Sequence, residues 1–238
     1  MNKPSIIFED NHILVIIKDQ GVPSQPDESG DLDMLTILKG YRKENEAKGG
    51  EAFVGLVHRL DRVTGGVMVF AKTSKSAMRL SEQMRNGGFS KKYLAITEGV
   101  PKKANAKLEN YLLKNEHTNK VDIVGQAVNG AKRAELTYYV RDKKEDRALL
   151  EIDLATGRSH QIRVQLSYIG TPILGDAKYG NRGGALALWA SELSFNHPTS
   201  GDRLRFSVFP PESGAWEMFD FGRKSHKTRG TENVETKQ

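Results

Sequence analysis

The amino-acid sequence predicts an α+β protein with a mixed, mainly antiparallel sheet and flanking helices. Segments rich in β-branched and aromatic residues follow one another through the middle of the chain, separated by turn residues. Only a few segments have the apolar spacing that is typical of an amphipathic helix. The strict alternation of strand and helix that a doubly wound parallel sheet requires is absent.

The N-terminal part of the chain is expected to form short strands and two helices. Strands are predicted at 6–8, 13–17, 53–57 and 67–71. A helix is predicted from Asp33 to about Ala47, with Asp31 or Asp33 as its N-cap. A second helix is expected to be capped by Ser74 and to end at Gly87-Gly88.

The remainder of the chain is expected to be rich in strands. The predicted strands are 92–99, 106–113, 121–124, 134–140, 148–154, 185–195 and 203–209, and a helix is predicted at 161–169. We expect residues 1–221 to form one domain. After Phe221 the apolar pattern ends, and the polar, basic segment 222–238 is expected to be disordered.

Composition excludes several classes of protein. The chain has 238 residues, a formal charge of +6 and no cysteine, which rules out disulfides, thiolate metal sites and a catalytic thiol. No apolar run approaches the length of a membrane span, and the N-terminus lacks the features of a signal peptide. We therefore expect a cytoplasmic protein that does not associate with membranes.

Familiar cofactor motifs are missing as well. No Gly-x-Gly-x-x-Gly follows a predicted strand, and the segment 125–132 departs from a phosphate-binding loop because Ala131 displaces the lysine. The Gly-x-Ser-x-Gly elbow is also absent, and no two histidines have metal-ligand spacing. The sequence therefore predicts chemistry without a metal, a nucleotide or another cofactor.

A loop around Asp61 is the most distinctive polar segment. It reads His58-Arg59-Leu60-Asp61-Arg62-Val63-Thr64-Gly65-Gly66 and joins two predicted strands, a common location for active-site groups. The cations of Arg59 and Arg62 favour the ionised form of Asp61. An aspartate before Thr-Gly-Gly is also a common turn former, so this segment alone leaves both interpretations open.

Three other polar segments are equally ambiguous when taken singly. Arg158, His160 and Gln161 could present donors to a phosphate or a base edge, or form a polar first helical turn capped by Thr156 or Ser159. The segment 170–180 could be functional or only a turn-rich loop. Lys91-Lys92-Tyr93 could bind a ligand or protect a strand edge with lysines.

Together, these segments resemble the RluA-type RNA pseudouridine synthases. The shared motifs are His-Arg-Leu-Asp-x-x-Thr-(Ser/Gly)-Gly, Lys-x-Tyr-x-Ala, Thr-Gly-Arg-x-His-Gln-Ile-Arg, Gly-Asp-x-x-Tyr-Gly and Leu-x-Phe-x-His-Pro, found in the family's order from Phe8 to about Pro211. The chain differs in having Gly65 in place of a serine and Lys18-Asp19 near the usual Lys-Pro. Many members of the family carry an S4-type RNA-binding module before the catalytic domain, and we expect none here, because the resemblance begins at Phe8.

The resemblance implies the pseudouridine synthase fold, with a central cleft, and isomerisation of uridine in RNA without a cofactor. It implies that Asp61 is the essential carboxylate, that Arg163 pairs with it and that Tyr93 stacks on the target base. The target nucleotide would be flipped out, with Arg59 or Arg62 filling the vacated space. The remaining expected substrate contacts are Thr64, Lys72, Lys75, Arg79, Lys92, Arg158, His160 and Gln161, with Lys91 and Arg85 as further phosphate contacts.

Several alternatives stay open at this stage. The substrate implied first is large-subunit ribosomal RNA, with tRNA as the alternative, and the protein is expected to be a monomer. A non-catalytic RNA-binding factor could have kept the fold. A glycoside or nucleoside hydrolase could use Asp61 with Asp153 or Asp176.

The distribution of charge favours RNA as the partner. Residues 1–50 carry six basic and nine acidic side chains, whereas residues 58–92 carry eight basic and two acidic ones. The tail 222–238 adds five basic and two acidic residues. The positive charge is therefore concentrated in the segment that contains Asp61 and Tyr93, where an RNA-modifying enzyme needs it.

Overall fold

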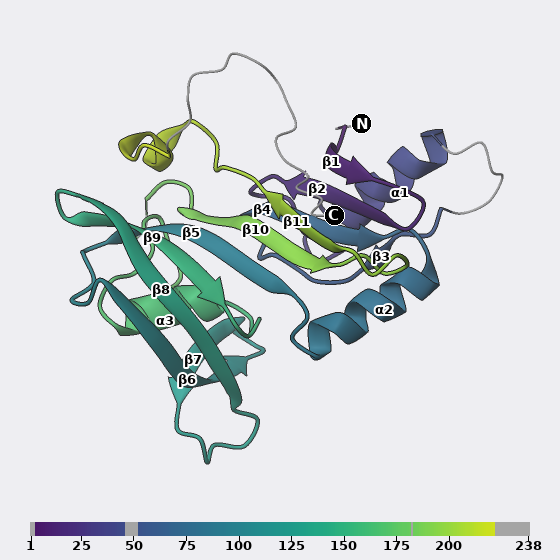
Figure 1. The fold of residues 1–238 in the computed structure, drawn as a ribbon. Coiled ribbons are helices and arrows are strands. Elements are labelled where there is room, and N and C mark those ends of the chain that lie inside the picture. The colour runs from purple at the N-terminus through teal and green to yellow at the C-terminus, as the bar shows by residue number, and fades with distance from the viewer. Residues whose placement is uncertain (1–2, 46–51, 182, 222–238) are drawn as a thin grey trace. The chain divides into compact units, whose positions relative to one another are not determined.

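The computed structural model describes residues 3–45, 52–181 and 183–221 (Figure 1). These residues divide into two compact units. The first contains the described residues up to Ser90 together with Ala190–Val208, and the second contains Lys91–Trp189 and the described residues from Phe209 onward. That residues 1–221 act as one catalytic domain stays a prediction, and the expected disordered tail lies outside the described residues.

Antiparallel strand pairs form the sheet of the first unit. β1 (Ser5–Glu9) pairs with β2 (Ile13–Lys18), and β2 pairs with β4 (Gly65–Ala71), which also pairs with the short β3 (Gly55–Leu56). β10 (Leu188–Asn196), most of which belongs to this unit, lies next to β4 and pairs with β11 (Arg203–Ser207). The predicted strands are confirmed, although β3 is shorter than the expected 53–57.

The helices of the first unit begin one residue after a side chain that accepts backbone N–H groups. Asp33 caps α1 (Met34–Asn45), because its Oδ1 accepts from the N–H of Leu35 at 2.9 Å. Thr73, and not the predicted Ser74, caps α2 (Ser74–Arg85), because Thr73 Oγ1 accepts from Ser76 N at 3.1 Å. Thr73 has extended backbone angles, so Ser74 is already the first helical residue.

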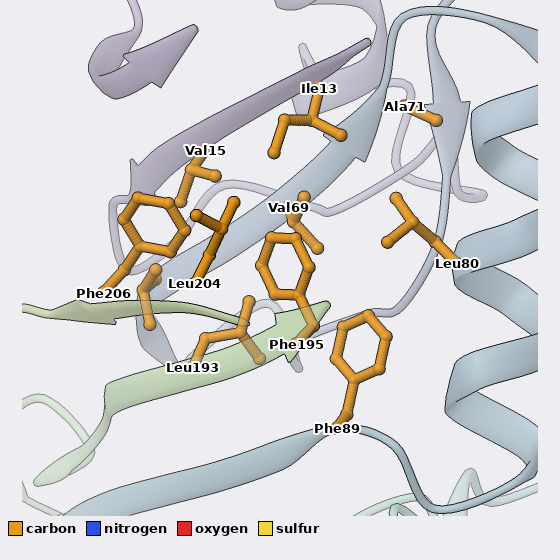
Figure 2. Close-up of a cluster of buried hydrophobic side chains, with 11 residues drawn as sticks. Ile13, Val15, Val69, Ala71, Leu80, Phe89, Leu193, Phe195, Leu204 and Phe206 are labelled. Carbon is orange, nitrogen blue, oxygen red and sulfur yellow. The ribbon is translucent and has the colours of Figure 1, made fainter. Parts of the chain in front are cut away.

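Side chains from α2 and four strands form the hydrophobic core of the first unit (Figure 2). Val69 and Leu80 lie in this cluster, and the rings of Phe89 and Phe195 stack with their centroids 5.2 Å apart. All seven residues of β4 are buried, which is why this strand reads as a continuous apolar run. The loop that carries Asp61 therefore leads directly into the most buried strand of the unit.

The second unit contains a five-stranded antiparallel arrangement. Its order is β5 (Ser90–Glu98), β9 (Arg147–Leu154), β8 (Lys132–Lys144), β6 (Asn105–Asn115) and β7 (Lys120–Val124). α3 (Gln161–Tyr168) packs against β6 and β7 (Figure 1). A short 3₁₀ helix, Gly214–Met218, was not expected from the sequence.

The predicted strands of the second unit are confirmed, with one extension. β8 continues past Val140 to Lys144, because a bulge between Val140 and Asp142 lets its polar end pair with β9 up to a tight turn at Glu145. Each unit combines antiparallel strands with few helices, which confirms the α+β class with a mainly antiparallel sheet.

Candidate active site

Asp61 lies half-buried in the loop between β3 and β4. Its backbone carbonyl accepts from Thr64 N at 2.9 Å, so the segment does form the turn that its composition favours. Ser24 fixes the preceding residue, because its Oγ donates to Leu60 O at 2.8 Å and lies 3.2 Å from Leu60 N. The turn is therefore held from a second segment of the same unit.

Lys18 is a fully buried lysine next to this loop. Its Nζ donates to the carbonyl oxygens of Asp19 at 2.9 Å, Val22 at 2.7 Å and Arg62 at 3.2 Å. Burial lowers the pKa of Lys18 to about 8, although the Asp61 carboxylate acts in the opposite direction.

Sequence reasoning gave Lys18 no role in the site. One feature of the sequence could have pointed to it. Lys18 directly follows the apolar run 13–17, so it lies at the end of a strand whose other residues are typical of a core. A charged residue in such a place requires several acceptors, and three backbone carbonyls supply them.

The residues that follow Asp61 shape the loop. Gly66 has a φ of +124°, and a Cβ there would lie 2.2 Å from Ala190 O, so only glycine fits between β4 and β10. Thr64, an expected substrate contact, is 2% exposed. Its position favours a role in shaping the turn over direct contact with RNA.

The two arginines beside Asp61 differ in their surroundings. Arg62 forms an ion pair with Asp31 and donates to Ser29 Oγ at 3.0 Å. Arg59 is exposed and has no carboxylate partner among residues 3–45, 52–181 and 183–221. Arg59 is thus the less constrained candidate for filling the space of a flipped nucleotide.

Of the other expected phosphate contacts in the first unit, Lys75 and Arg85 are exposed, whereas Lys72 and Arg79 are partly buried. The side chain of Lys72 is only 9% exposed and its Nζ donates to Glu9 Oε1 at 2.7 Å, so its charge is already compensated. Arg79 donates to Pro198 O at 2.7 Å and ties α2 to the turn after β10. Neither arrangement favours the phosphate role that the sequence suggested for these two residues.

In the second unit, Tyr93 and Lys92 occupy opposite faces of β5. Tyr93 is 8% exposed and pairs in register with Ile152. Lys92 Nζ lies 3.2 Å from Glu151 Oε1 and 3.7 Å from Asp153 Oδ1. The charge of Lys92 is therefore balanced by two carboxylates, which argues against its expected contact with a phosphate.

Arg163 forms a buried, bidentate ion pair with Asp176. Nε donates to Asp176 Oδ2 at 2.8 Å and Nη2 donates to Oδ1 at 2.7 Å, with side-chain exposures of 7% and 0%. Burial alone would raise the pKa of Asp176, but Arg163 and two backbone N–H groups hold it below its usual value. A carboxylate held in this way is a poor general acid, which disfavours a hydrolase that uses Asp176. The pair uses two of the five N–H groups of Arg163.

His160 and Arg163 are both held by Tyr179, which sequence reasoning left without a role. His160 Nδ1 lies 2.7 Å from Tyr179 Oη, which accepts from Val121 N at 2.7 Å. The Arg163 guanidinium lies 5.2 Å from the centroid of the Tyr179 ring. The available signal was the motif Gly-Asp-x-x-Tyr-Gly, whose aspartate and tyrosine both face the start of α3.

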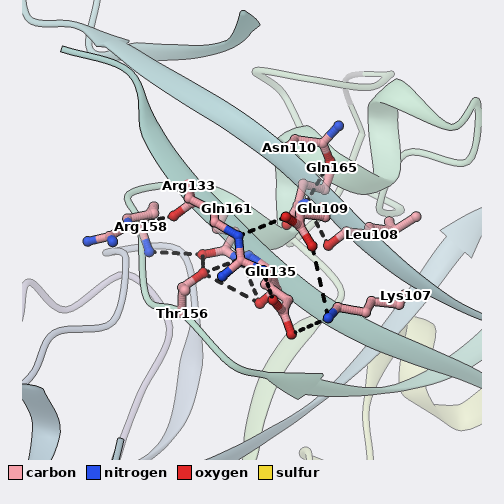
Figure 3. Close-up of polar contacts among 10 residues, drawn as sticks. All are labelled: Lys107, Leu108, Glu109, Asn110, Arg133, Glu135, Thr156, Arg158, Gln161 and Gln165. Carbon is pink, nitrogen blue, oxygen red and sulfur yellow. Dashed lines mark hydrogen bonds and ion pairs between the residues drawn. The ribbon is translucent and has the colours of Figure 1, made fainter. Parts of the chain in front are cut away.

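Gln161 fixes the loop before α3 (Figure 3). Its Oε1 accepts from Thr156 Oγ1 at 2.7 Å and from Arg158 N at 3.0 Å, and its Nε2 donates to Glu135 O at 3.0 Å. At 3% exposure, Gln161 is a structural residue more than the substrate contact that we expected. Neither Thr156 nor Ser159 caps α3, because the N-cap is His160, with a φ of 51° and no side-chain cap.

Among the residues that the structure describes, no group of three or more His, Cys, Asp or Glu residues could hold a metal ion. None of the helices in the same residues is both long and apolar enough to span a membrane.

Comparison with known proteins places these motifs in one family. Residues 12–168 match the RNA pseudouridylate synthase family. An uncharacterized RNA pseudouridine synthase of Bacillus subtilis (strain 168), YjbO, is 32% identical over 213 residues, covering 87% of this chain and 72% of the relative. Ribosomal large subunit pseudouridine synthase C of Escherichia coli (strain K12) is 33% identical over 221 residues, covering 88% of this chain and 67% of the relative.

A solved structure agrees with the sequence relatives. Human RNA Pseudouridylate Synthase Domain Containing 4 matches with a TM-score of 0.74 and 27% identity, over 87% of this chain and 88% of that chain. The family match covers more than half of the chain, and the curated relatives match a larger share of it. The chain therefore belongs to the RNA pseudouridylate synthase family, as the resemblance of its motifs implied.

Proposed function

We propose that this protein isomerises uridine to pseudouridine in structured RNA, with large-subunit ribosomal RNA as the substrate. The relative from Escherichia coli is named for the large ribosomal subunit, which supports rRNA over tRNA. The observation that carries the catalytic assignment is the Asp61 loop, where a half-buried carboxylate lies near a fully buried ammonium. The hydrogen bonds of this loop hold Asp61 in a defined position.

The chemistry requires one group that can stabilise or capture a reactive sugar or base. The N1–C1′ bond of the target uridine breaks, the base turns, and C5 bonds to C1′. The proton leaves C5, and N1 gains one, so the product is an isomer of the substrate. Asp61 supplies the carboxylate, acting at C1′, on the base, or by removing a ribose proton to give a glycal.

Two residues of the second unit complete the proposed catalytic set. Tyr93 stacks on the target base, and its phenol helps to remove the C5 proton. Arg163 is the second, and its orientation depends on the bidentate contact with Asp176. The motif positions of these residues support the assignment.

The target nucleotide is flipped out of its helix before it reacts, because C1′ is not accessible within a duplex. Arg59 is the better candidate to fill the vacated space, since Arg62 is engaged by Asp31. We also expect the enzyme to act as a monomer in the cytoplasm.

The decisive test uses RNA tritiated at C5 of uracil. The wild-type protein is expected to release tritium from large-subunit rRNA transcripts without releasing free uracil. Asp61→Asn should abolish tritium release while RNA binding is retained, because the substitution removes only the charge of the carboxylate. Retained turnover in Asp61→Asn would contradict the assignment of Asp61.

The same assay separates the alternatives. Free uracil would indicate a hydrolase, and binding without either product on any RNA would indicate a non-catalytic RNA-binding factor. Tritium release from tRNA transcripts, but not from rRNA, would replace the proposed substrate and leave the reaction unchanged.

A further inference from the structure

Lys91 is a partly buried cation whose surroundings differ from those of its neighbour Lys92. Side chains alternate between the two faces of a strand, so Lys91 shares a face of β5 with Tyr93 and Lys92 lies on the other. Lys92 has Glu151 and Asp153 beside it. Lys91 has no hydrogen-bond acceptor and no carboxylate partner in the part of the chain that the structure describes.

A second cation lies next to Lys91. Arg158 directly precedes the turn into α3, and its only described side-chain bond runs from Nε to Arg133 O at 3.1 Å. In Figure 3 the terminal nitrogens of Arg158 point away from Glu109 and Glu135. The residues around these two cations therefore bring no negative charge to balance them.

Gly157 allows Lys91 to approach this turn. A Cβ at position 157 would lie 3.2 Å from Lys91 Nζ, so any larger residue would crowd the ammonium. The φ of Gly157 is not in the left-handed region, so the tight feature at this position is the close approach of Lys91 and not the backbone conformation.

Burial first, and the charge of Arg158 second, lower the pKa of Lys91. Holding an unpaired ammonium out of water beside another cation is unfavourable in the free protein. Groups placed in this way are common where a ligand of opposite charge binds. The two cations, which no described carboxylate balances, therefore indicate a binding site for an anion.

We propose that Lys91 and Arg158 bind a phosphate group of the RNA, on the face of β5 that carries Tyr93. The phosphate belongs to the target nucleotide or to its immediate neighbour, because Tyr93 stacks on the target base. The inference rests on the proposed function for two points, namely that the anion is an RNA phosphate and that Tyr93 stacks on the target base. Lys92, one residue away, takes no part in this site.

The adjacent lysines provide a matched test. Binding of a uridine heptamer to the full chain is measured against salt concentration for the wild type, Lys91→Met and Lys92→Met. Lys91→Met should weaken binding about tenfold at low salt and reduce the slope of log K against log salt by about 0.7. Lys92→Met should change neither by a comparable amount.

A stability measurement separates this role from a structural one. Because Lys91 is unpaired in the free protein, Lys91→Met should keep or raise the thermal midpoint while it weakens binding. Arg158→Gln should also weaken binding, and its effect should not add to that of Lys91→Met if the two cations hold one phosphate.

The proposal would be overturned if Lys91→Met and Lys92→Met reduced the slope of log K against log salt equally, or if neither reduced it. It would also be overturned if Lys91→Met lost binding only because the variant unfolds. The wild-type protein is assayed for pseudouridine in parallel. If it forms pseudouridine while Lys91→Met binds normally, the phosphate site is wrong and the proposed function stands. If no pseudouridine forms on any RNA, the comparison of binding still decides whether the anion site exists.

Discussion

At the scale of single residues, the most unusual feature of this molecule is a small set of buried charged side chains. Lys18 is fully buried with three carbonyl acceptors, and Arg163 and Asp176 form a buried pair. Buried charges are costly unless they are paired and hydrogen-bonded. Lys18 donates to the loop that carries Asp61, and Arg163 is itself one half of the second pair, so the buried charges adjoin or include residues that we propose as catalytic.

Lys18 predicts a distinctive dependence of stability on pH. Its pKa is about 8 in the folded protein and 10.5 as the ordinary value. Between these values the unfolded chain binds more protons, so the Lys18 contribution to the free energy of unfolding rises with pH. The penalty is fully present below pH 8 and is relieved by about 3 kcal/mol toward pH 10.5.

Urea unfolding of the wild type and Lys18→Met at several pH values checks this expectation. The difference between their free energies of unfolding should move in favour of the wild type as the pH rises from 8 to 10.5. A difference that stays constant over this range would contradict the assigned pKa.

The Arg163–Asp176 pair predicts a large loss of stability. Asp176→Asn leaves the Arg163 guanidinium buried without its carboxylate, which costs about 3–5 kcal/mol in comparable cases. The double variant Asp176→Asn with Arg163→Gln should lose less than the sum of the two single losses. Denaturant unfolding of the four proteins measures the coupling, and additive losses would mean that the pair contributes little.

At the scale of elements, short turns determine where the functional side chains lie. The Asp61 turn leads into β4, which is buried along its whole length. The loop before α3 is held by Gln161, and its last residue, His160, adopts a left-handed conformation. In the loop before α3, Gln161, which the sequence suggests as a substrate contact, bonds to the backbone of Arg158 and Glu135.

The N-cap of α2 predicts a moderate effect. Thr73→Ala removes the acceptor for Ser76 N and should lower the free energy of unfolding by about 1 kcal/mol. Ser74→Ala is the matched control, because Ser74 is the first helical residue and should have a smaller effect. Thermal or urea denaturation distinguishes the two variants. A larger loss of unfolding free energy in Ser74→Ala would show that Ser74, which the sequence suggested, is the N-cap.

At the scale of the whole molecule, the uneven distribution of charge predicts where RNA binds. Lys75 and Lys39 are both exposed helical lysines of the first unit, but Lys75 lies in the basic segment 58–92 and Lys39 in the acidic segment 1–50. Lys75→Glu should therefore weaken RNA binding and make it less dependent on salt.

Lys39→Glu serves as the control and should have little effect on affinity or on salt dependence. Filter binding of an rRNA transcript over a range of salt concentrations measures both. Equal effects of the two substitutions would show that binding depends on net charge and not on its location.

The sequence by itself determined the class of fold, most of the strands and the family. Strands such as β4 and β9 are apolar enough for local patterns to reveal them. Five motifs in the family's order identified Asp61, Tyr93 and Arg163 as the residues to examine. These features depend on local composition and spacing, which a single sequence displays directly.

Only the tertiary structure decided which charged side chains are already paired with another charge. Lys72 and Lys92 look like phosphate contacts in the sequence, but carboxylates from other strands balance their charges. Lys91 looks equivalent to Lys92, yet it is the one without a partner among the described residues. The partners of a charged side chain come from distant parts of the chain, so local patterns cannot reveal them. The sequence therefore identifies the chemistry, and the fold determines which charges remain available for it.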